Sequence, residues 1–436
     1  MNDAAIPTED RKTPLRRVVA ASLIGTTIEW YDFFLYGSAA ALIFNELFFP
    51  QFEPLVGTLL AFATYALGFI ARPVGGIVFG HFGDRIGRKK LLMFSLILMG
   101  VATILIGLLP TYAQIGIWAP IALIILRLVQ GFAVGGEWGG AVLLAAEHGD
   151  AARRGFWASW PQAGVPAGSL LAAGVLAILA GTLSEADFVA WGWRVAFVLS
   201  AVLVVVGWWI RTSVAESRTF EEQLEAAEMP PKAPALDVIR ECPRAVILGS
   251  GLRLGENISY YIITTFSITY LTEVAAESHS LALNAILIGA IVQFFAIPLL
   301  ALLSDKIGRR PVYAFGGFGL AAFSFVFFSM LGSGSSAAIV AAIVIALVLH
   351  GAMYGPQAAF IAELFPTRIR YSGVSIAYQL TSIVAGSLAP IIALALYREY
   401  ESALPVAIYV GAACAISGIT ALLARETKGV ELSTIR

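Results

Sequence analysis

The feature that most limits what this chain can fold into is a series of twelve apolar stretches, each close to the ~20 residues that a helix needs to cross a bilayer. They cover residues 18–43, 55–81, 91–109, 118–146, 155–181, 193–210, 244–272, 281–303, 311–332, 337–365, 372–397 and 403–424. Charged residues make up only 13% of the 436, about half the share in soluble domains. The sequence therefore predicts an all-α membrane protein with twelve transmembrane helices rather than a soluble globule.

The positive charges predict which side of the membrane each connection faces. Of the 28 Lys and Arg residues, 23 lie in the N-terminal segment, the C-terminal segment and every second connection between stretches. The remaining connections hold only Arg398, and four arginines lie within or at the ends of stretches: Arg72, Arg127, Arg194 and Arg253. Because positively charged loops stay in the cytoplasm, both termini are predicted to be cytoplasmic, which requires an even number of spans.

One long polar segment divides the stretches into two sets of six. Residues 213–243 contain a Glu-rich run and then the break Pro-Pro-Lys-Ala-Pro at 230–234. We predict a cytoplasmic tail at 1–17, a six-helix bundle at 18–212, a cytoplasmic linker at 213–243, a second six-helix bundle at 244–424 and a cytoplasmic tail at 425–436. A solvated linker explains residues 213–243 better than a regulatory or partner-binding element, because acidic runs are commonly solvated.

Two short motifs occur once in each half of the chain. The pattern Asp-basic-Ile-Gly-Arg begins at Asp84 after the second stretch and again at Asp305 after the eighth, 221 residues later. An Ala-Glu pair ends at Glu147 after the fourth stretch and at Glu363 after the tenth, 216 residues later. Each pair is followed by an arginine-containing segment, at 153–155 and 367–370. Two motifs that repeat at nearly one offset indicate a duplicated architecture with parallel repeats.

Two six-helix halves with Gly-x-x-x-Asp-Arg-x-Gly-Arg-Lys at 80–89 resemble the major facilitator superfamily over nearly the whole chain. Three further motifs resemble its metabolite:proton symporters: Thr-Ile-Glu-Trp-Tyr-Asp-Phe at 27–33, Ala-Arg-Pro-Val-Gly-Gly at 71–76, and Arg-Leu-Val-Gln-Gly-Phe at 127–132 leading into Gly-Gly-Glu-Trp-Gly-Gly at 135–140. The resemblance implies a major facilitator fold in a bacterial-type plasma (inner) membrane, and proton-coupled uptake of a small organic acid or a zwitterionic osmolyte.

Two details favour the organic acids within that family. Arg-Leu-Gly-Glu at 253–256 looks most like the shikimate-type branch. The osmolyte carriers of the family have a long C-terminal coiled coil, whereas this chain continues for about a dozen residues beyond the last stretch. We therefore expect proton-coupled symport of a small organic carboxylate, shikimate-like or another mono- or dicarboxylate, with uptake of a betaine- or proline-type osmolyte as the alternative.

The resemblance implies that the repeated cytoplasmic motifs gate one face of the carrier. Asp84 and Arg88 are four residues apart, so they can pair along one helical turn or reach the end of a neighbouring helix. A carboxylate at a helix N-terminus, with guanidinium groups beside C-terminal carbonyls, can hold such a face shut. Membrane topology alone explains Lys89 and Lys90, but it does not explain the repeated aspartates. The predicted gating residues are Asp84, Arg85, Arg88, Glu147, Arg154, Asp305, Arg309, Glu363 and Arg368.

Ionisable residues at membrane depth cost about 2.5–3.5 kcal/mol each, so each needs a partner, a cavity or a function. Apart from Arg194 at a span end, the interior holds three arginines and four carboxylates: Arg72, Arg127, Arg253, Glu29, Asp32, Glu137 and Glu256. Glu29 and Asp32 share one helical face, where repulsion and desolvation favour a proton on one of them. The alternative is a fully salt-bridged, inert network. We predict proton coupling at Glu29, Asp32 and Glu256.

The buried arginines predict an anionic substrate. Arg127 and Arg253 stay charged and offer planar forks that bind a carboxylate at two points. Arg72 suits a gate or packing role as well as substrate contact, and aromatic and amide residues inside bundles also pack or bridge helices. The predicted substrate-binding residues are Arg127, Arg253, Arg72, Tyr36, Trp138, Gln162, Tyr260, Gln357 and Tyr378.

Other classes of function fit the sequence less well. It has no HExxH, GxSxG or P-loop pattern, so we predict that the protein is not an enzyme. With only Cys242 and Cys414, and with His81 and His350 outside any Cys/His cluster, we expect no disulfide framework, no cofactor and no metal site. We also expect a monomer with no nucleic-acid partner. A channel fits less well than alternating access, and a transport-dead receptor on the same scaffold is a further alternative.

Overall fold

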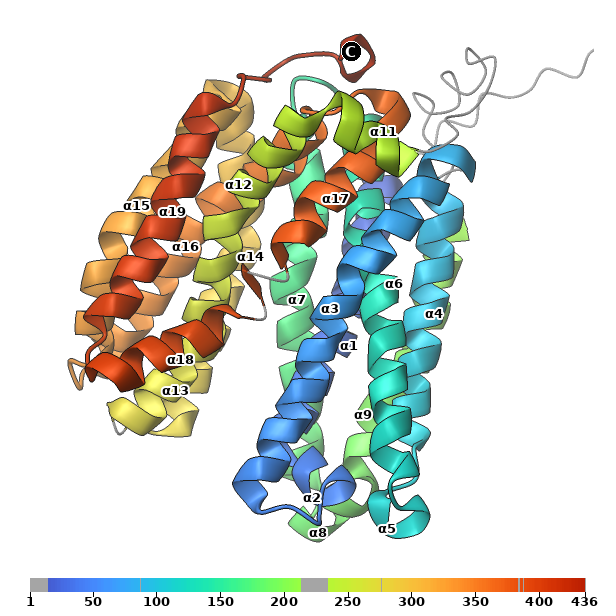
Figure 1. Ribbon diagram of the computed structural model, residues 1–436, viewed down its shortest axis with the longest axis vertical. Coiled ribbons are helices and arrows are strands. Elements are labelled where there is room, and N and C mark those ends of the chain that lie inside the picture. The colour runs from blue at the N-terminus through green and yellow to red at the C-terminus, as the bar shows by residue number, and fades with distance from the viewer. Residues whose placement is uncertain are drawn as a thin grey trace, which may run out of the picture.

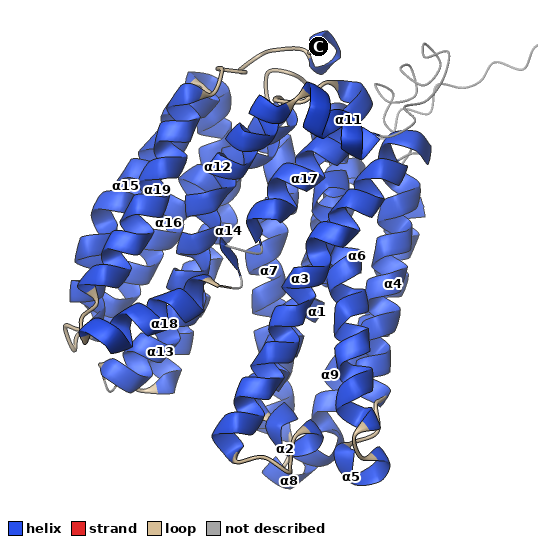
Figure 2. Ribbon diagram, in the orientation of Figure 1, coloured by secondary structure: helices blue, strands red, loops and turns tan. Residues whose placement is uncertain are grey.

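A computed structural model describes residues 15–86, 88–212, 234–275, 277–382, 385–386 and 388–435. Within these ranges the regular structure is entirely helical (Figure 2). Residues 1–14 of the predicted tail (1–17) and residues 213–233 of the predicted linker (213–243) lie outside the described residues. The all-α fold class is confirmed.

The first half of the chain forms one bundle. Its long helices are α1 Leu15–Leu42, α3 Pro54–Ile86, α4 Arg88–Leu108, α6 Trp118–His148, α7 Arg154–Thr182, and the continuous run of α8 Glu185–Asp187, η1 Phe188–Gly192 and α9 Trp193–Thr212. The short helices α2 Phe44–Phe48 and α5 Tyr112–Ile115 lie between them at one end of the bundle (Figure 1).

The second half repeats this pattern after the linker helix α11 Pro234–Glu241. Its elements are α12 Pro243–Tyr261 continued by η2 Ile262–Phe266, α13 Ser267–Thr269 and η3 Tyr270–Val274, then α14 His279–Ile307, α15 Arg309–Leu331, α16 Ser336–Ala362, η4 Thr367–Ile369, α17 Arg370–Ser382, α18 Ala389–Tyr400, α19 Leu404–Leu423 and η6 Leu432–Thr434.

Ten helical segments among the described residues are long and apolar enough to cross a membrane. The other two predicted crossings are interrupted or polar. Residues 243–274 carry Arg253 and Glu256 and pass through two π-helical turns, and residues 370–400 are divided between α17 and α18. The predicted twelve-helix architecture is therefore confirmed, and the two irregular crossings belong to the half that follows the linker.

The two bundles stand side by side, and they meet most closely at one end (Figure 1). We call the end that carries α11 and residues 424–435 the linker face, and the opposite end the far face. Helix α7 packs against α14 and α16, and α3 packs against α17. Toward the far face the ribbons of the two bundles diverge (Figure 1).

The repeated Asp-basic-Ile-Gly-Arg motif lies on helix ends, not in a loop as its position between spans suggested. Helix α3 runs to Ile86 and α4 begins at Arg88. In the second half, α14 runs to Ile307 and α15 begins at Arg309, with a single residue between them. That residue, Gly308, has a φ of 111°, a backbone conformation that glycine adopts without a steric penalty.

Glycines bring α3 and α6 into backbone contact. A Cβ atom added at Gly75, Gly131 or Gly135 would lie 1.9–2.1 Å from a carbonyl oxygen of the facing helix. Helices approach this closely only where side chains are absent. The close pairing fixes the relative positions of Arg72 on α3 and Arg127 on α6, because each arginine lies within one turn of such a contact.

We expect Gly135→Ala to destabilise the protein, since its methyl group would meet the Arg72 carbonyl oxygen at 2.0 Å. Overpacking of this kind costs about 1–3 kcal/mol. The matched control is Gly174→Ala, because a Cβ at Gly174 meets no atom within 4 Å. Thermal unfolding in detergent should show a clear loss of Tm for Gly135→Ala only, and equal Tm values for the two variants would contradict the close-packing argument.

Candidate functional site

Buried charged residues gather in two places, one at the linker face and one at mid-depth. The first group, which we call the gate cluster, consists of Glu147, Arg154, Asp305, Arg309, Glu363 and Arg370. The side chains of Arg154, Arg309, Glu363 and Arg370 are at most 4% exposed. The second group, the central site, contains the predicted substrate-binding and proton-coupling residues. Each group is built from both bundles.

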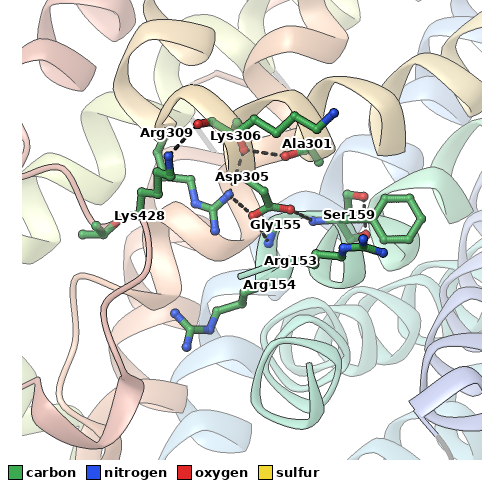
Figure 3. Close-up of polar contacts among 12 residues, drawn as sticks. Arg153, Arg154, Gly155, Ser159, Ala301, Asp305, Lys306, Arg309 and Lys428 are labelled. Atoms are coloured by element: carbon green, nitrogen blue, oxygen red, sulfur yellow. Dashed lines mark hydrogen bonds and ion pairs between the residues drawn. The ribbon is translucent and has the colours of Figure 1, made fainter. Parts of the chain in front are cut away.

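Asp305 joins the bundles by capping a helix of the other half. Its two carboxylate oxygens accept hydrogen bonds from the backbone N–H groups of Gly155 and Phe156, at 2.9 and 2.8 Å (Figure 3). These groups lie in the first turn of α7, where free N–H donors and the helix dipole favour an anion. Arg309, one turn after Asp305 on the next helix, pairs with the same carboxylate at 2.5 Å.

Two reciprocal ion pairs cross between the bundles beside Asp305. Arg154 of α7 donates to Glu363 at 2.9 Å, and Arg370 of α17 pairs with Glu147 at 3.2 Å. Removing one member of a buried pair leaves an uncompensated charge and costs about 3–5 kcal/mol. The gate cluster therefore holds the two bundles together at the linker face.

The reciprocal pairs correct one predicted gating residue. Arg368 pairs with Glu241 of α11 on the surface, with both side chains nearly half exposed, and it does not face Glu147. Arg370 takes that position. The internal repeat contained this information, because the 216-residue offset that relates Glu147 to Glu363 also relates Arg154 to Arg370. The sequence analysis took Arg368, the first arginine after Glu363, as the equivalent of Arg154, whereas the equivalent residue is Arg370.

The structure describes the predicted gating residues of the first-half motif, Asp84, Arg85 and Arg88, to different extents. The side chains of Asp84 and Arg88 lie outside the described part of the chain. Arg85 is half-buried, and its Nη1 lies 3.3 Å from Nε2 of His81, one turn earlier on the same helix. The motif of the first half is thus described only in part, and its gating role stays a prediction.

The C-terminal tail adds contacts to the gate cluster that the sequence did not predict. Arg154 donates to the carbonyl oxygen of Val430 at 2.7 Å, and Arg370 to that of Leu432 at 2.9 Å. Thr427 donates its hydroxyl to Glu363 at 2.5 Å. The tail therefore connects arginines from both bundles.

Glu426 fixes the start of this tail to the N-terminus of α15. Its carboxylate accepts backbone hydrogen bonds from Arg309, Arg310, Thr427 and Lys428, at 2.9–3.1 Å. Burial raises the pKa of this carboxyl, but the four donors outweigh burial and hold the pKa below its usual value. The cap is thus present at neutral pH, and its contribution to stability is lost as the pH falls into the acid range.

In the central site, Arg72 and Arg127 extend into an aromatic environment. The guanidinium carbon of Arg127 lies 4.3–4.8 Å from the ring centres of Phe33, Tyr36 and Tyr65. That of Arg72 lies 4.3 Å from the ring centre of Phe33. Such contacts stabilise a buried cation without neutralising it.

The two arginines have unused hydrogen-bonding capacity. Arg127 is 1% exposed and donates from Nη1 to the Gln130 side chain at 3.1 Å, but its Nε and Nη2 are buried and have no partner. The same two atoms of Arg72 are also buried and unpartnered. Neither arginine forms an ion pair with a described residue. Nε and Nη2 lie on one edge of the guanidinium plane, so each arginine has a two-point donor edge without a hydrogen-bond partner. In Arg127 this edge lies beside Gly68 of α3, where an added Cβ would be 2.7 Å from Nε.

The predicted proton-coupling pair on α1 is buried. Glu29 and Asp32 are 3% and 1% exposed. Asp32 accepts a hydrogen bond on Oδ1 from Ser200 of α9 at 2.5 Å, and its Oδ2 is buried with no partner. Glu137, the fourth interior carboxylate, accepts from Ser95 of α4 at 2.8 Å. None of the ion pairs described for this structure involves Asp32.

Arg253 and Glu256 are engaged with each other in the second bundle. Arg253 pairs with Glu256 through Nη1. Glu256 also receives hydrogen bonds from His350 at 2.8 Å and from Gln357 at 3.2 Å. His350 is held in turn by Gln293 at 2.8 Å. The Glu256 carboxylate therefore has partners within its own bundle, whereas Nε of Arg253 is buried and has no hydrogen-bond partner.

The remaining predicted substrate-binding residues lie between these two groups. Trp138 stacks on Tyr378 of the other bundle, with ring centres 3.5 Å apart, and donates to Gln162. Gln162 donates across the bundles to the Tyr354 carbonyl oxygen at 3.2 Å. The Tyr378 ring also lies 3.7 Å from the guanidinium carbon of Arg253.

Two of them contact residues within their own bundle. Tyr36 hydrogen-bonds to Thr64 at 2.6 Å, and Tyr260 packs beside the His350 ring with ring centres 5.2 Å apart. All nine residues predicted to bind substrate are thus buried, and their contact with a substrate stays a prediction.

Sequence reasoning missed several residues of the central site. They are Phe33, Tyr65, Thr103, Gln130, Ser200 and Gln293. Phe33 and Gln130 lie inside motifs that the sequence singled out, so proximity to Asp32 and Arg127 along the helix was an available signal. The others are ordinary span residues whose position depends on how neighbouring helices are rotated. Among the described residues there is no group of three His, Cys, Asp or Glu side chains that could hold a metal ion.

Comparison with known proteins gives the family. The sequence model of the Major Facilitator Superfamily matches residues 22–390 and 254–434. This chain belongs to the major facilitator superfamily. The structure of the proton:xylose symporter XylE bound to 6-bromo-6-deoxy-D-glucose superimposes with a TM-score of 0.76 over 97% of this chain and 98% of XylE, at 17% identity. At that identity the likeness shows the shared fold alone.

Relatives within the superfamily are considerably more similar in sequence. The shikimate transporter of Escherichia coli K12 is 41% identical over 95% of both chains. The inner membrane metabolite transport protein YhjE of the same organism is 41% identical over 96% of this chain and 97% of its own. The proline/betaine transporter of E. coli K12 is 34% identical over 95% of this chain and 84% of its own. This superfamily member is therefore a membrane transporter of small metabolites and not an enzyme.

The gate cluster predicts a measurable effect of a single charge. We expect Glu363→Gln to weaken the contact between the bundles, because it removes the carboxylate that Arg154 and Arg309 share. In a variant without native cysteines, spin labels at Ala152 and Ile307 report the distance between the bundles at the linker face. Double electron–electron resonance should show that the distance between the two labels shifts to longer values in Glu363→Gln.

The control is Arg368→Gln, which breaks a pair of similar composition on the surface. Exposed pairs contribute about 0–1 kcal/mol, so the distance distribution should stay as in the wild type. An unchanged distribution in Glu363→Gln, or an equal shift in both variants, would contradict the gating role of the buried cluster.

Proposed function

We propose that this protein takes up a small organic carboxylate together with at least one proton, by alternating access of the central site. The observation that supports this most directly is the free Nε and Nη2 edge of buried Arg127. An arginine edge of this kind binds a carboxylate through two parallel hydrogen bonds. The free edge of Arg72 supports a second contact, because both guanidinium groups pack on the Phe33 ring.

The charge balance of the first bundle also supports an anionic substrate. Two buried guanidinium groups without an ion-pair partner among the described residues are costly in a low-dielectric interior. A substrate carboxylate would supply the missing counter-charge. The aromatic faces around the site are already covered by arginine, which leaves them poorly suited to a quaternary ammonium group.

We assign the coupled proton to Asp32. Its Oδ2 is buried without a hydrogen-bond partner, and a proton on this atom would convert a buried charge into a neutral group. Glu256 is a weaker candidate, because Arg253, His350 and Gln357 all donate to its carboxylate. Glu29, one turn before Asp32, is the second candidate for the proton.

We further propose that the linker face is cytoplasmic, as the distribution of positive charge in the sequence predicts. The gate cluster and the C-terminal tail then close the carrier toward the cytoplasm in this conformation. Opening requires that the Arg154–Glu363 and Arg370–Glu147 pairs separate and that Asp305 leaves the N-terminus of α7. The sequence similarity to the shikimate transporter of E. coli supports an organic acid as the substrate.

Uptake into liposomes under an imposed pH gradient tests this function. The wild type should accumulate shikimate or a small dicarboxylate such as 2-oxoglutarate against its gradient. Asp32→Asn should lose this accumulation and keep exchange of substrate across the membrane. Arg127→Lys should raise the apparent KM at least tenfold, since it loses one of two charge-assisted hydrogen bonds worth about 1.5–3 kcal/mol each.

Arg194→Lys is the control for a lysine substitution outside the site. Arg194 donates to the carbonyl oxygens of Gly107 and Leu109 at the far-face end of α4, and its replacement should leave the KM unchanged. Uptake of a betaine and of no organic acid would contradict the proposal. Full apparent affinity for the acid in Arg127→Lys would also contradict it, and binding without any exchange would indicate a receptor.

A further inference from the structure

Asn257 is a buried polar residue of the second bundle that the function proposed above does not use. It lies on α12 directly after Glu256, and it is 3% exposed. Its Oδ1 atom is buried and has no hydrogen-bond partner. A buried polar atom without a partner is costly in a protein interior, so its presence calls for a ligand or another specific explanation.

The surroundings of a glycine show where this oxygen points. Gly386 lies in the interruption between α17 and α18, and a Cβ atom added there would be 3.1 Å from Oδ1 of Asn257. The same position is 3.2 Å from the Phe69 ring of α3 and 3.3 Å from the Tyr261 ring of α12. These two rings also contact each other, with centres 5.6 Å apart. The Asn257 amide therefore faces the first bundle, at the point where α3, α12 and the interrupted crossing meet.

Phe69 connects this point with the arginines of the first bundle. The guanidinium carbon of Arg72 lies 4.4 Å from the centre of the Phe69 ring, and Nε and Nη2 of Arg72 have no partner. A donor edge from one bundle and an amide oxygen from the other thus border the same aromatic side chain, and both lack a hydrogen-bond partner. A small ligand that binds the arginines through its carboxylate can reach Asn257 with its other end.

The charges near Asn257 select the chemistry of that other end. An ammonium group would bring a second positive charge close to Arg72. A second carboxylate would face the acceptor atom of the amide, and Arg253 is already paired with Glu256. A hydroxyl group is neutral, donates to an amide oxygen, and accepts from an amide nitrogen if the side chain is flipped. A hydroxyl group therefore fits this position best.

We infer that Asn257 selects a hydroxylated carboxylate, by a hydrogen bond to a substrate hydroxyl group while Arg127 and Arg72 bind the carboxylate. The inference rests on the proposed function and narrows its substrate class, since that function covers dicarboxylates as well. A site that hydrogen-bonds a hydroxyl group rejects an analogue without one, because the polar group of the site is then left unpaired.

Two acids that differ only in their hydroxyl groups test this selectivity. They are shikimate and cyclohex-1-ene-1-carboxylate, and calorimetry measures their binding to the full-length protein in nanodiscs at one pH. The wild type should bind shikimate at least tenfold more tightly than the cyclohexene acid and than 2-oxoglutarate. Asn257→Leu keeps the size of the side chain. It should weaken binding of shikimate about tenfold, as expected for one buried hydrogen bond, and leave the affinity for the cyclohexene acid unchanged.

Asn45→Leu is the matched control. Asn45 lies on α2 at the far-face end of the first bundle, and its Oδ1 is also buried without a partner (Figure 1). Its replacement should leave the affinities for both ring acids unchanged. Arg127→Lys should weaken binding of both ring acids by the same factor, because it acts on the carboxylate that they share.

The possible outcomes separate the role of Asn257 from the proposed function. Equal affinity of the wild type for the two ring acids, or tighter binding of 2-oxoglutarate than of shikimate, would overturn the inference and leave uptake of a carboxylate intact. Unchanged shikimate binding in Asn257→Leu, or an equal loss for both ring acids, would also overturn it. A wild type that binds none of the three acids would overturn the proposed function and the inference with it.

Discussion

A charge buried in the membrane interior is costly unless it has a partner, and this constraint explains how the buried charged residues of this protein are arranged. At the linker face the constraint is met between the bundles, where Arg154 pairs with Glu363, Arg370 with Glu147, and Asp305 with the first turn of α7. In the second bundle it is met by Arg253 and Glu256. In the first bundle Arg127 keeps a free donor edge. The paired charges hold the fold together, and the unpartnered edge of Arg127 is where we propose that the substrate carboxylate binds.

The two groups of charges are connected by the same helices. Helix α7 carries Arg154 at its start and Gln162 two turns later, and α6 carries Arg127 at mid-depth and Glu147 at its end. Helix α6 is also packed on α3 through glycine contacts with carbonyl oxygens, which leave little room for the two helices to shift against each other. The proposed alternating access requires such a connection between the central site and the gate cluster.

Sequence reasoning predicted the elements that depend on local patterns of residues. It missed residues whose positions depend on how neighbouring helices are rotated about their axes. The lengths of the apolar stretches predicted the twelve spans. The motifs repeated in the two halves predicted that Asp305, Arg154 and Glu363 belong to one group. Arg370 was missed because the first arginine after the repeated Ala-Glu pair was taken in place of the one at the 216-residue offset. Thr103 and Tyr65 were missed because each is an ordinary residue of an apolar span. Only the packing of α4 and α3 against their neighbours brings these two side chains to Gln130 and Arg127.

The central claim is that acid and proton occupy the first bundle together, at Arg127 and Asp32. Proton exchange during binding tests it most directly, with purified protein in a weakly buffered solution and a pH indicator. Addition of shikimate or 2-oxoglutarate at a pH where Asp32 is ionised should cause the wild type to take up close to one proton per acid bound. Asp32→Asn should bind the acid without this uptake. Binding of the acid by the wild type with no proton uptake at any pH would contradict the account.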